Sequence, residues 1–240
     1  MYQDRHDAAL QLASRLSAYR GQHPLVLGIP RGGVPMAHCI ANALEGELDV
    51  VMAQKMAHPL LPEYAIGAVN EGGWTYYSPF ADTLIRCPLE LDVEKLRQLD
   101  LIRQRRAQYT PTREPLEIRG RLVIVVDDGV ATGATMVAAL QEVRSRLPRK
   151  LVCAVPVASH ESLRQIRPWV DELVCLQTPA QLKAISRHYR QFAPVSDVEV
   201  VRCLQASCRP AQKFQQKPPH APQQEPQQEP QHEPQTTRVS

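Results

Sequence analysis

Apolar residues gather along the chain in short runs, which alternate with longer stretches of helical periodicity. The runs predict buried strands at 25–29, 48–53, 122–126, 151–157 and 173–176, with short strands also at 65–69 and 74–77. Helical spacing predicts helices at 4–19, 36–44, 91–109, 136–147, 161–166, 181–189 and 196–204. Because strands alternate with helices, we expect an α/β fold whose mostly parallel, twisted sheet is flanked by helices.

The composition of the chain changes at about Arg209. A repeat of Pro, Gln and Glu follows, and it holds too few apolar residues to form a core. We therefore expect a folded domain over 1–208 and a disordered tail over 209–240. The tail could be a tether or a recruiting segment, but a solvated tail without a catalytic role is the simpler interpretation.

Polar and glycine-rich residues follow three of the predicted strands, at 30–33, 54–55 and 127–135. Ligands of parallel sheets bind beyond the carboxyl ends of the strands. We therefore expect these three segments to meet at one edge of the sheet.

The segment 121–135 combines an apolar strand, two adjacent acids and a run of small and hydroxyl residues before a helix. Backbone N–H groups at a helix N-terminus bind anions, and small side chains let a phosphate approach closely. The carboxylates of Asp127 and Asp128 could accept hydrogen bonds from sugar hydroxyls. This pattern predicts a ribose 5-phosphate site, with a phosphate cradle formed by Ala131, Thr132, Gly133, Ala134 and Thr135. The alternative is an ordinary strand followed by a polar helix cap at Thr132 or Thr135.

A second glycine-containing loop follows the first predicted strand. Gly32 and Gly33 permit consecutive backbone N–H groups to face a diphosphate, and Arg31 can add a charge-assisted contact. The alternative is a glycine turn with Arg31 in solvent. The downstream acid pair favours diphosphate binding.

The order and spacing in 121–135 resemble the signature of type I phosphoribosyltransferases, and the loop at 28–35 resembles their pyrophosphate loop. The resemblance implies a Rossmann-like fold with a small hood. It also implies transfer of ribose 5-phosphate from phosphoribosyl diphosphate to a nucleobase-like acceptor, with release of pyrophosphate and help from Mg²⁺. Asp127 and Asp128 would hold the ribose, directly or through metal-bound water.

The resemblance extends over most of residues 4–204. Lys55 lies where the orotate branch has a basic pair that contacts the diphosphate, but here the pair is Gln54-Lys55. The stretches 56–69, 171–174 and 192–197 are similar to a little-characterised bacterial group of the family. His58, Glu63 and the arginines within 103–106 could close over the substrate, although structural roles are simpler.

One departure bears on the acceptor. Ala131 stands where the 6-oxopurine branch usually has an aspartate, which disfavours hypoxanthine or guanine. The acceptor stays open. Two other functions are consistent with the same residues. One is a regulatory protein that senses the donor or a nucleotide without transfer, and the other is a hydrolase with water as the acceptor.

Composition narrows the setting of the protein. The net charge of +3 is small and spread along the chain, so we expect no nucleic-acid partner. The N-terminus is too polar for a signal peptide, and no apolar run is long enough to cross a membrane. Six scattered cysteines form no metal-ligand spacing. We expect a cytoplasmic enzyme of nucleotide salvage or a related pathway, with a homodimer as one option for its assembly.

Overall fold

A computed structural model describes residues 1–58, 65–78, 81, 88–111 and 113–207. Contacts between Cα atoms divide the chain into two units, Met1–Arg209 and Pro210–Ser240. The second unit lies outside the described residues, so the expected disorder of the tail stays a prediction.

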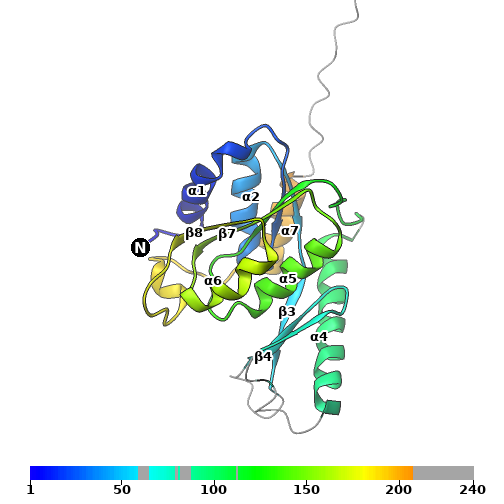
Figure 1. Cartoon of the computed structure of the whole chain (residues 1–240). Helices are drawn as coiled ribbons and strands as arrows, with labels where there is room; N and C mark the ends of the chain where they lie inside the picture. The colour runs from blue at the N-terminus through cyan, green and yellow to red at the C-terminus, as the bar shows by residue number, and fades with distance from the viewer. Residues whose placement is uncertain (59–64, 79–80, 82–87, 112, 208–240) are drawn as a thin grey trace, which may run out of the picture. The chain divides into compact units, whose positions relative to one another are not determined.

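The first unit is built on a parallel five-stranded sheet with the order β2-β1-β6-β7-β8 (Figure 1). Its strands are β1 (Leu25–Gly28), β2 (Glu47–Val50), β6 (Leu122–Val126), β7 (Lys150–Val157) and β8 (Glu172–Gln177). The expected parallel α/β sheet is therefore confirmed. All of β1 and β6 is buried, as continuous apolar runs in a sheet covered on both faces require.

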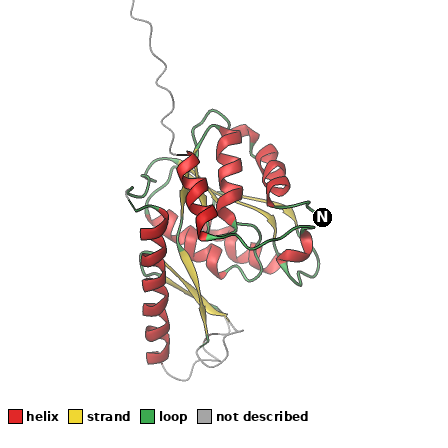
Figure 2. Cartoon of the chain, turned by 180° about the vertical axis from the view of Figure 1, so that it is seen from behind, coloured by secondary structure: helices red, strands yellow, loops and turns green. Residues whose placement is uncertain are grey.

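Helices cover both faces of this sheet (Figures 1 and 2). Successive side chains of β6 enter two separate cores, Ile124 and Val126 on one face and Val123 and Val125 on the other. The first core includes side chains of α1 (Arg5–Arg15), α2 (Gly33–Leu44) and α7 (Asp197–Ser207). The second includes side chains of α5 (Ala134–Ser145) and α6 (His160–Ile166).

A second, antiparallel sheet of three strands lies beside the long helix α4 (Pro88–Tyr109). Its strands are β3 (Ala53–Ala57), β4 (Ala65–Asn70) and β5 (Thr75–Tyr77). The strand expected over 48–53 is wrong in one respect. It ends at Val50, and the chain then enters β3, so residues 54 and 55 lie within a strand of another sheet.

Short 3₁₀ turns complete the unit at η1 (Ser17–Tyr19), η2 (Arg167–Trp169) and η3 (Ile185–His188). The helix expected over 181–189 is reduced to η3. The backbone beyond it pairs instead with the N-terminal segment: the Tyr2 N–H donates to the His188 carbonyl at 2.8 Å, and the Arg190 N–H donates to the Tyr2 carbonyl at 2.8 Å. At the start of α7, the Ser196 hydroxyl accepts the Glu199 N–H at 3.2 Å and so caps the helix.

We expect removal of residues 210–240 to leave the melting temperature unchanged within about 1 °C, because the described elements all belong to the first unit. Thermal unfolding of the full and shortened chains, followed by circular dichroism, tests this. A drop of several degrees would show that the tail packs on the domain.

Candidate functional site

The loops that follow β1 and β6 lie side by side because these strands are neighbours in the centre of the sheet. Gly28 is in register with Val126, and the Ile29 N–H donates to the Val126 carbonyl at 2.9 Å. A Cβ atom at Gly33 would stand 2.4 Å from the Val126 carbonyl oxygen, so only glycine allows this approach. The structure thus brings together two of the three segments that the sequence places at one edge.

Two helices begin at these loops without side-chain caps. α2 has Gly32 at its N-cap and α5 has Gly133. In neither helix does a capping side chain accept a hydrogen bond from the first N–H groups, and neither first turn carries an acidic residue. The first N–H groups of α5, at 134–136, are therefore open to an anion, with the positive end of the helix dipole behind them. At the start of α2, the Gly33 and Val34 N–H groups donate to the carbonyls of Ile29 and Arg31, at 3.0 and 3.2 Å. The alternative of a cap at Thr132 or Thr135 is not what the structure shows.

The backbone of the loop before α5 is fixed from behind by the β7–α6 connection. The Val130 N–H donates to the Val157 carbonyl at 2.9 Å, and the Ser159 hydroxyl donates to the Ala131 carbonyl at 3.1 Å. Gly133 has φ +87°, and a Cβ atom there would stand 3.2 Å from the Cβ of Ser162. Ala131 and Thr132 are exposed on the open side of the loop. The loop is thus anchored by hydrogen bonds on one side, while Ala131 and Thr132 stay accessible on the other.

Asp127 and Asp128 follow directly after β6. One carboxylate oxygen of Asp127 accepts the Asp128 N–H at 2.8 Å. The Asp128 carboxylate forms an ion pair with Arg5, whose Nε–H donates to Oδ2 at 2.8 Å. The Tyr189 hydroxyl donates to the Asp128 carbonyl at 2.6 Å. The second acid is therefore oriented by residues from both ends of the described chain.

Burial shifts the pKa of both acids upward. It raises the pKa of Asp127 well above its ordinary value, and the neighbouring charge of Asp128 raises it further. Burial also raises the pKa of Asp128, although Arg5 counteracts part of the effect. Two carboxylates kept close in a partly dry site are costly for the fold, which is typical of residues held for function.

We expect Asp127→Asn to stabilise the protein at pH 7. A carboxyl group whose pKa is raised by folding favours the folded state below its ordinary pKa of 3.8, and that contribution is lost as the pH rises through the raised value. The asparagine side chain carries no charge at any pH, so the variant does not lose this stability as the pH rises. The gain should be about 0.5–2 kcal/mol, the usual range for a stabilising replacement at a functional position.

Urea unfolding of the Asp127→Asn variant and the parent protein at pH 7 and at about pH 4 measures the difference. The gain should shrink at the lower pH, where the Asp127 carboxyl of the folded protein is protonated and that of the unfolded chain is only about half ionised. Equal stability at pH 7 would contradict a costly charge at Asp127.

Arg31 lies at the start of the α2 loop with 42% of its side chain exposed. Its Nη1 is 3.7 Å from an oxygen of Asp197, the first residue of α7. The other oxygen of Asp197 accepts the hydroxyl of Tyr109, the last residue of α4. The guanidinium is therefore accessible and loosely oriented from behind.

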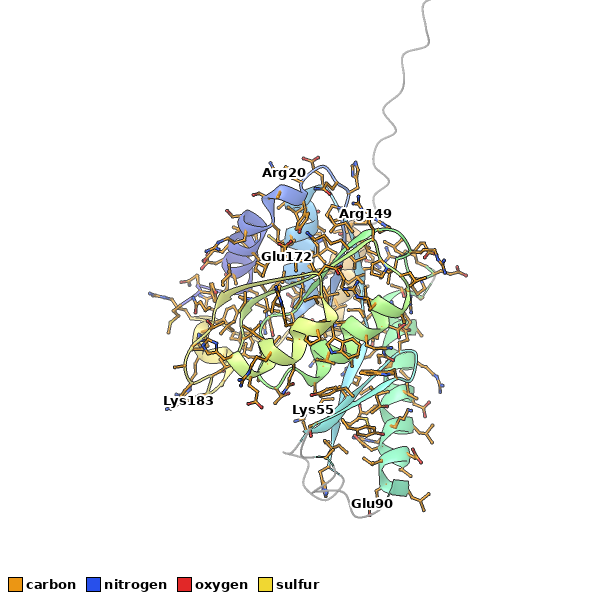
Figure 3. All side chains as sticks on the ribbon, in the orientation of Figure 1. Arg20, Lys55, Glu90, Arg149, Glu172 and Lys183 are labelled. Carbon is orange, nitrogen blue, oxygen red and sulfur yellow. The ribbon has the colours of Figure 1, made fainter. Side chains whose placement is uncertain are left out.

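Lys55 is the predicted site residue that the structure places differently. Expected just past a strand of the parallel sheet, it lies inside β3, where it pairs in register with Ala68 (Figure 3). Its side chain is exposed and forms no hydrogen bond or ion pair within the described part of the chain. The difference arises because the parallel strand ends at Val50 and the chain then enters β3, which pairs antiparallel with β4; the apolar pattern does not reveal this change of sheet.

Other residues considered for closing the site have structural partners. Arg106 binds both carboxylate oxygens of Glu71, at 2.6 and 2.9 Å, and Arg103 pairs with Asp100 at 2.8 Å. His58 is buried. Glu63 lies outside the described residues.

Arg5 and Tyr189 are site neighbours that the sequence patterns do not single out. The sequence holds a weak signal for Arg5. A cation in the first turn of a helix interacts unfavourably with the helix dipole, so its presence there suggests a contact outside the helix. The helical spacing at 181–189 places Tyr189 in a helix that does not form. Its role becomes visible only when the N-terminal and C-terminal segments pair.

Within the described residues, no cluster of three or more His, Cys, Asp or Glu side chains could hold a metal ion. No helix in the described ranges has both the length and the apolar character needed to cross a bilayer.

Comparison with known proteins agrees with this arrangement. The family model of the phosphoribosyl transferase domain matches residues 2–190. Two curated proteins of Mycobacterium tuberculosis, from strains H37Rv and CDC 1551, each carry the name "Putative phosphoribosyl transferase". Both are 38% identical to this chain over 213 residues, which is 87% of this chain and 47% of theirs. The chain thus spans about half the length of these relatives.

The crystal structure of the protein TT1426 from Thermus thermophilus is similar over most of this chain. It is 41% identical in sequence and superposes with a TM-score of 0.71, covering 85% of this chain and 97% of that one. A family model that spans most of the described unit, together with these relatives, bears out the resemblance seen at 121–135: the chain belongs to the phosphoribosyltransferase family.

Proposed function

We propose that the protein is an enzyme that transfers ribose 5-phosphate from phosphoribosyl diphosphate to a nucleobase-like acceptor and releases pyrophosphate. The observation that carries the proposal is the pair Asp127 and Asp128 between two uncapped helix N-termini, on loops that follow adjacent central strands. A donor with a phosphate at one end, a sugar diol in the middle and a diphosphate at the other end has matching chemistry.

Each part of the donor has a partner under this proposal. The α5 N-terminus, with Ala131, Thr132, Gly133, Ala134 and Thr135, would bind the 5-phosphate through backbone N–H groups. The α2 loop, with Arg31, Gly32 and Gly33, would bind the diphosphate. Asp127 and Asp128 would accept hydrogen bonds from the ribose hydroxyls.

Lys55 keeps a proposed role at the diphosphate, although its place in the fold is new. β3 begins three residues beyond the end of β2, the outermost strand of the parallel sheet. The exposed ammonium of Lys55 therefore lies on the segment that continues from the carboxyl end of β2. A flexible exposed ammonium can reach a charged ligand as a point charge without a fixed protein partner.

Mg²⁺ suits the residues present. It prefers oxygen ligands and is typically held by one or two carboxylates together with substrate phosphates and water. Asp127 and Asp128 would hold it, directly or through water, and it would neutralise charge on the leaving diphosphate.

The chemistry asks for positioning more than for covalent catalysis. The bond between ribose C1 and the diphosphate oxygen breaks, and a bond from C1 to an acceptor nitrogen forms. C1 becomes cationic in the transition state, as in glycoside cleavage. The carboxylates at the ribose, and exclusion of water around it, would favour transfer over hydrolysis.

The acceptor is left as a class. Ala131 offers no carboxylate to a purine ring, so adenine-type or pyrimidine-type acceptors fit better than hypoxanthine or guanine. A role in nucleotide salvage in the cytoplasm, and assembly as a homodimer, remain part of the proposal and depend on the acceptor found.

Titration calorimetry with phosphoribosyl diphosphate, with and without Mg²⁺, tests the donor site. Pyrophosphate release over a panel of bases then tests transfer. Metal-dependent binding with base-dependent release would support the enzyme. Binding without release under any base would favour a sensor, and release without base would indicate a hydrolase. No binding would overturn the proposal.

A further inference from the structure

The side chain of Arg5 reaches across the sheet edge to the second acid of the site. Its Nε lies 2.8 Å from Asp128 Oδ2, and each of the two side chains is only 14% exposed. The same guanidinium donates from Nη1 to the Ala193 carbonyl at 2.7 Å, and its carbon lies 3.8 Å from the ring centre of Phe192. Three contacts of different kinds thus fix one cation.

Gly32, in the loop before α2, also packs against the Asp128 carboxylate. A Cβ atom at Gly32 would stand 1.9 Å from Oδ2 but 3.2 Å from Oδ1. Oδ2 is therefore enclosed between the Arg5 guanidinium and the backbone of Gly32. Oδ1 receives no hydrogen bond from another residue in the described part of the chain, so it is the oxygen left for a ligand.

Local helix physics does not account for a cation at this position. Arg5 is the first residue of α1, next to the Asp4 cap, where the helix dipole disfavours positive charge. Arg15, in the last turn of the same helix, occupies the favourable end. The ion pair with Asp128 explains why an arginine stands at this position.

We propose that Arg5 is a positioning residue for the donor: by holding Asp128 Oδ2 against Gly32, it presents Oδ1 to the ribose hydroxyls. The inference rests on the proposed ribose role of Asp128. It excludes two other roles for the same guanidinium, namely a direct contact with the donor and competition with the ribose for the carboxylate.

A double-mutant cycle on the full chain separates these roles. The affinity for phosphoribosyl diphosphate with Mg²⁺ is measured by calorimetry for the parent, Arg5→Met, Asp128→Asn and the double variant. We expect Arg5→Met to weaken binding about tenfold in the parent and less than about twofold in the Asp128→Asn background. Arg5→Lys should retain part of the affinity, because an ammonium can keep the charge but not all three contacts.

Arg15→Met is the matched control, since it removes the same side chain from the other end of α1 and should leave the affinity unchanged. Melting temperatures of all variants identify any loss of folding. If Arg5→Met unfolds the protein, Arg5→Lys carries the same comparison in both backgrounds.

The outcomes separate this inference from the proposed function. An equal loss in both backgrounds would mean that Arg5 acts on the donor by itself, and tighter binding by Arg5→Met would mean competition. Unchanged affinity would remove the role altogether. Each of these overturns the inference while a weakened Asp128→Asn variant upholds the ribose site. An Asp128→Asn variant that binds like the parent, or a parent that binds no donor, overturns both.

Discussion

Replacing Asp128 with asparagine is expected to weaken binding of phosphoribosyl diphosphate by a factor of about 10 to 100. Hydrogen bonds to a charged group contribute about 1.5–3 kcal/mol, and the amide loses the charge while keeping the shape. The stability of the protein should change by less than about 1 kcal/mol. Relief from the burial that raises the Asp128 pKa opposes the loss of the ion pair, and the Arg5 guanidinium keeps its contacts with the Ala193 carbonyl and the Phe192 ring.

Calorimetric titration with the donor and Mg²⁺ measures the affinity, and urea unfolding measures the stability. Asp100→Asn is a suitable control, because that exposed carboxylate pairs with Arg103 on α4 and has no place in the proposed site. Unchanged donor affinity in Asp128→Asn would defeat the ribose assignment. A loss of affinity that tracks a loss of folding would make Asp128 a structural residue.

The variant Gly32→Ala is expected to lose donor binding about 100-fold and to lose about 1–3 kcal/mol of stability. The added methyl would stand 1.9 Å from Asp128 Oδ2, which is far inside van der Waals contact. Either the carboxylate rotates away from Arg5 or the loop moves, and both changes disturb the ribose and diphosphate positions together. A misplacement of about 1 Å in such a site costs about 100-fold.

Gly21→Ala provides the comparison. Gly21 has φ +74° and nothing within 4 Å of an added methyl, so the substitution strains the backbone away from the site. It should reduce the melting temperature while leaving the donor affinity unchanged. Gly32→Ala with parental affinity would show that Asp128 can move without consequence for the donor.

The centre of the fold follows closely from local sequence. Every residue of the runs at 25–28 and 122–126 is buried, as expected for strands of a sheet that is covered on both faces. The glycines after them point to tight approaches, which the structure shows at Gly33 beside Val126. Local pattern is sufficient here because burial and backbone freedom are local properties.

Features that depend on long-range pairing lie beyond the pattern. The residues after β2 are equally compatible with a longer parallel strand or with a new antiparallel one, and only pairing with β4 decides. The pattern therefore places Lys55 just past a strand of the parallel sheet, whereas it lies inside β3. Likewise, 181–189 has helical spacing, but backbone hydrogen bonds with Tyr2 outcompete a helix there. Arg5 becomes a candidate only because these remote segments meet.

The pairing of Tyr2 with 188–190 also has a consequence for the order in which the protein is made. A ribosome releases Arg5 and Asp128 long before Tyr189, Phe192 and Ala193, the residues that fix both. During synthesis, Asp127 and Asp128 are therefore present for some time before the contacts made by Tyr189, Phe192 and Ala193 can form. We expect the nascent chain to acquire its ligand only once the last strand and the segment after it have emerged.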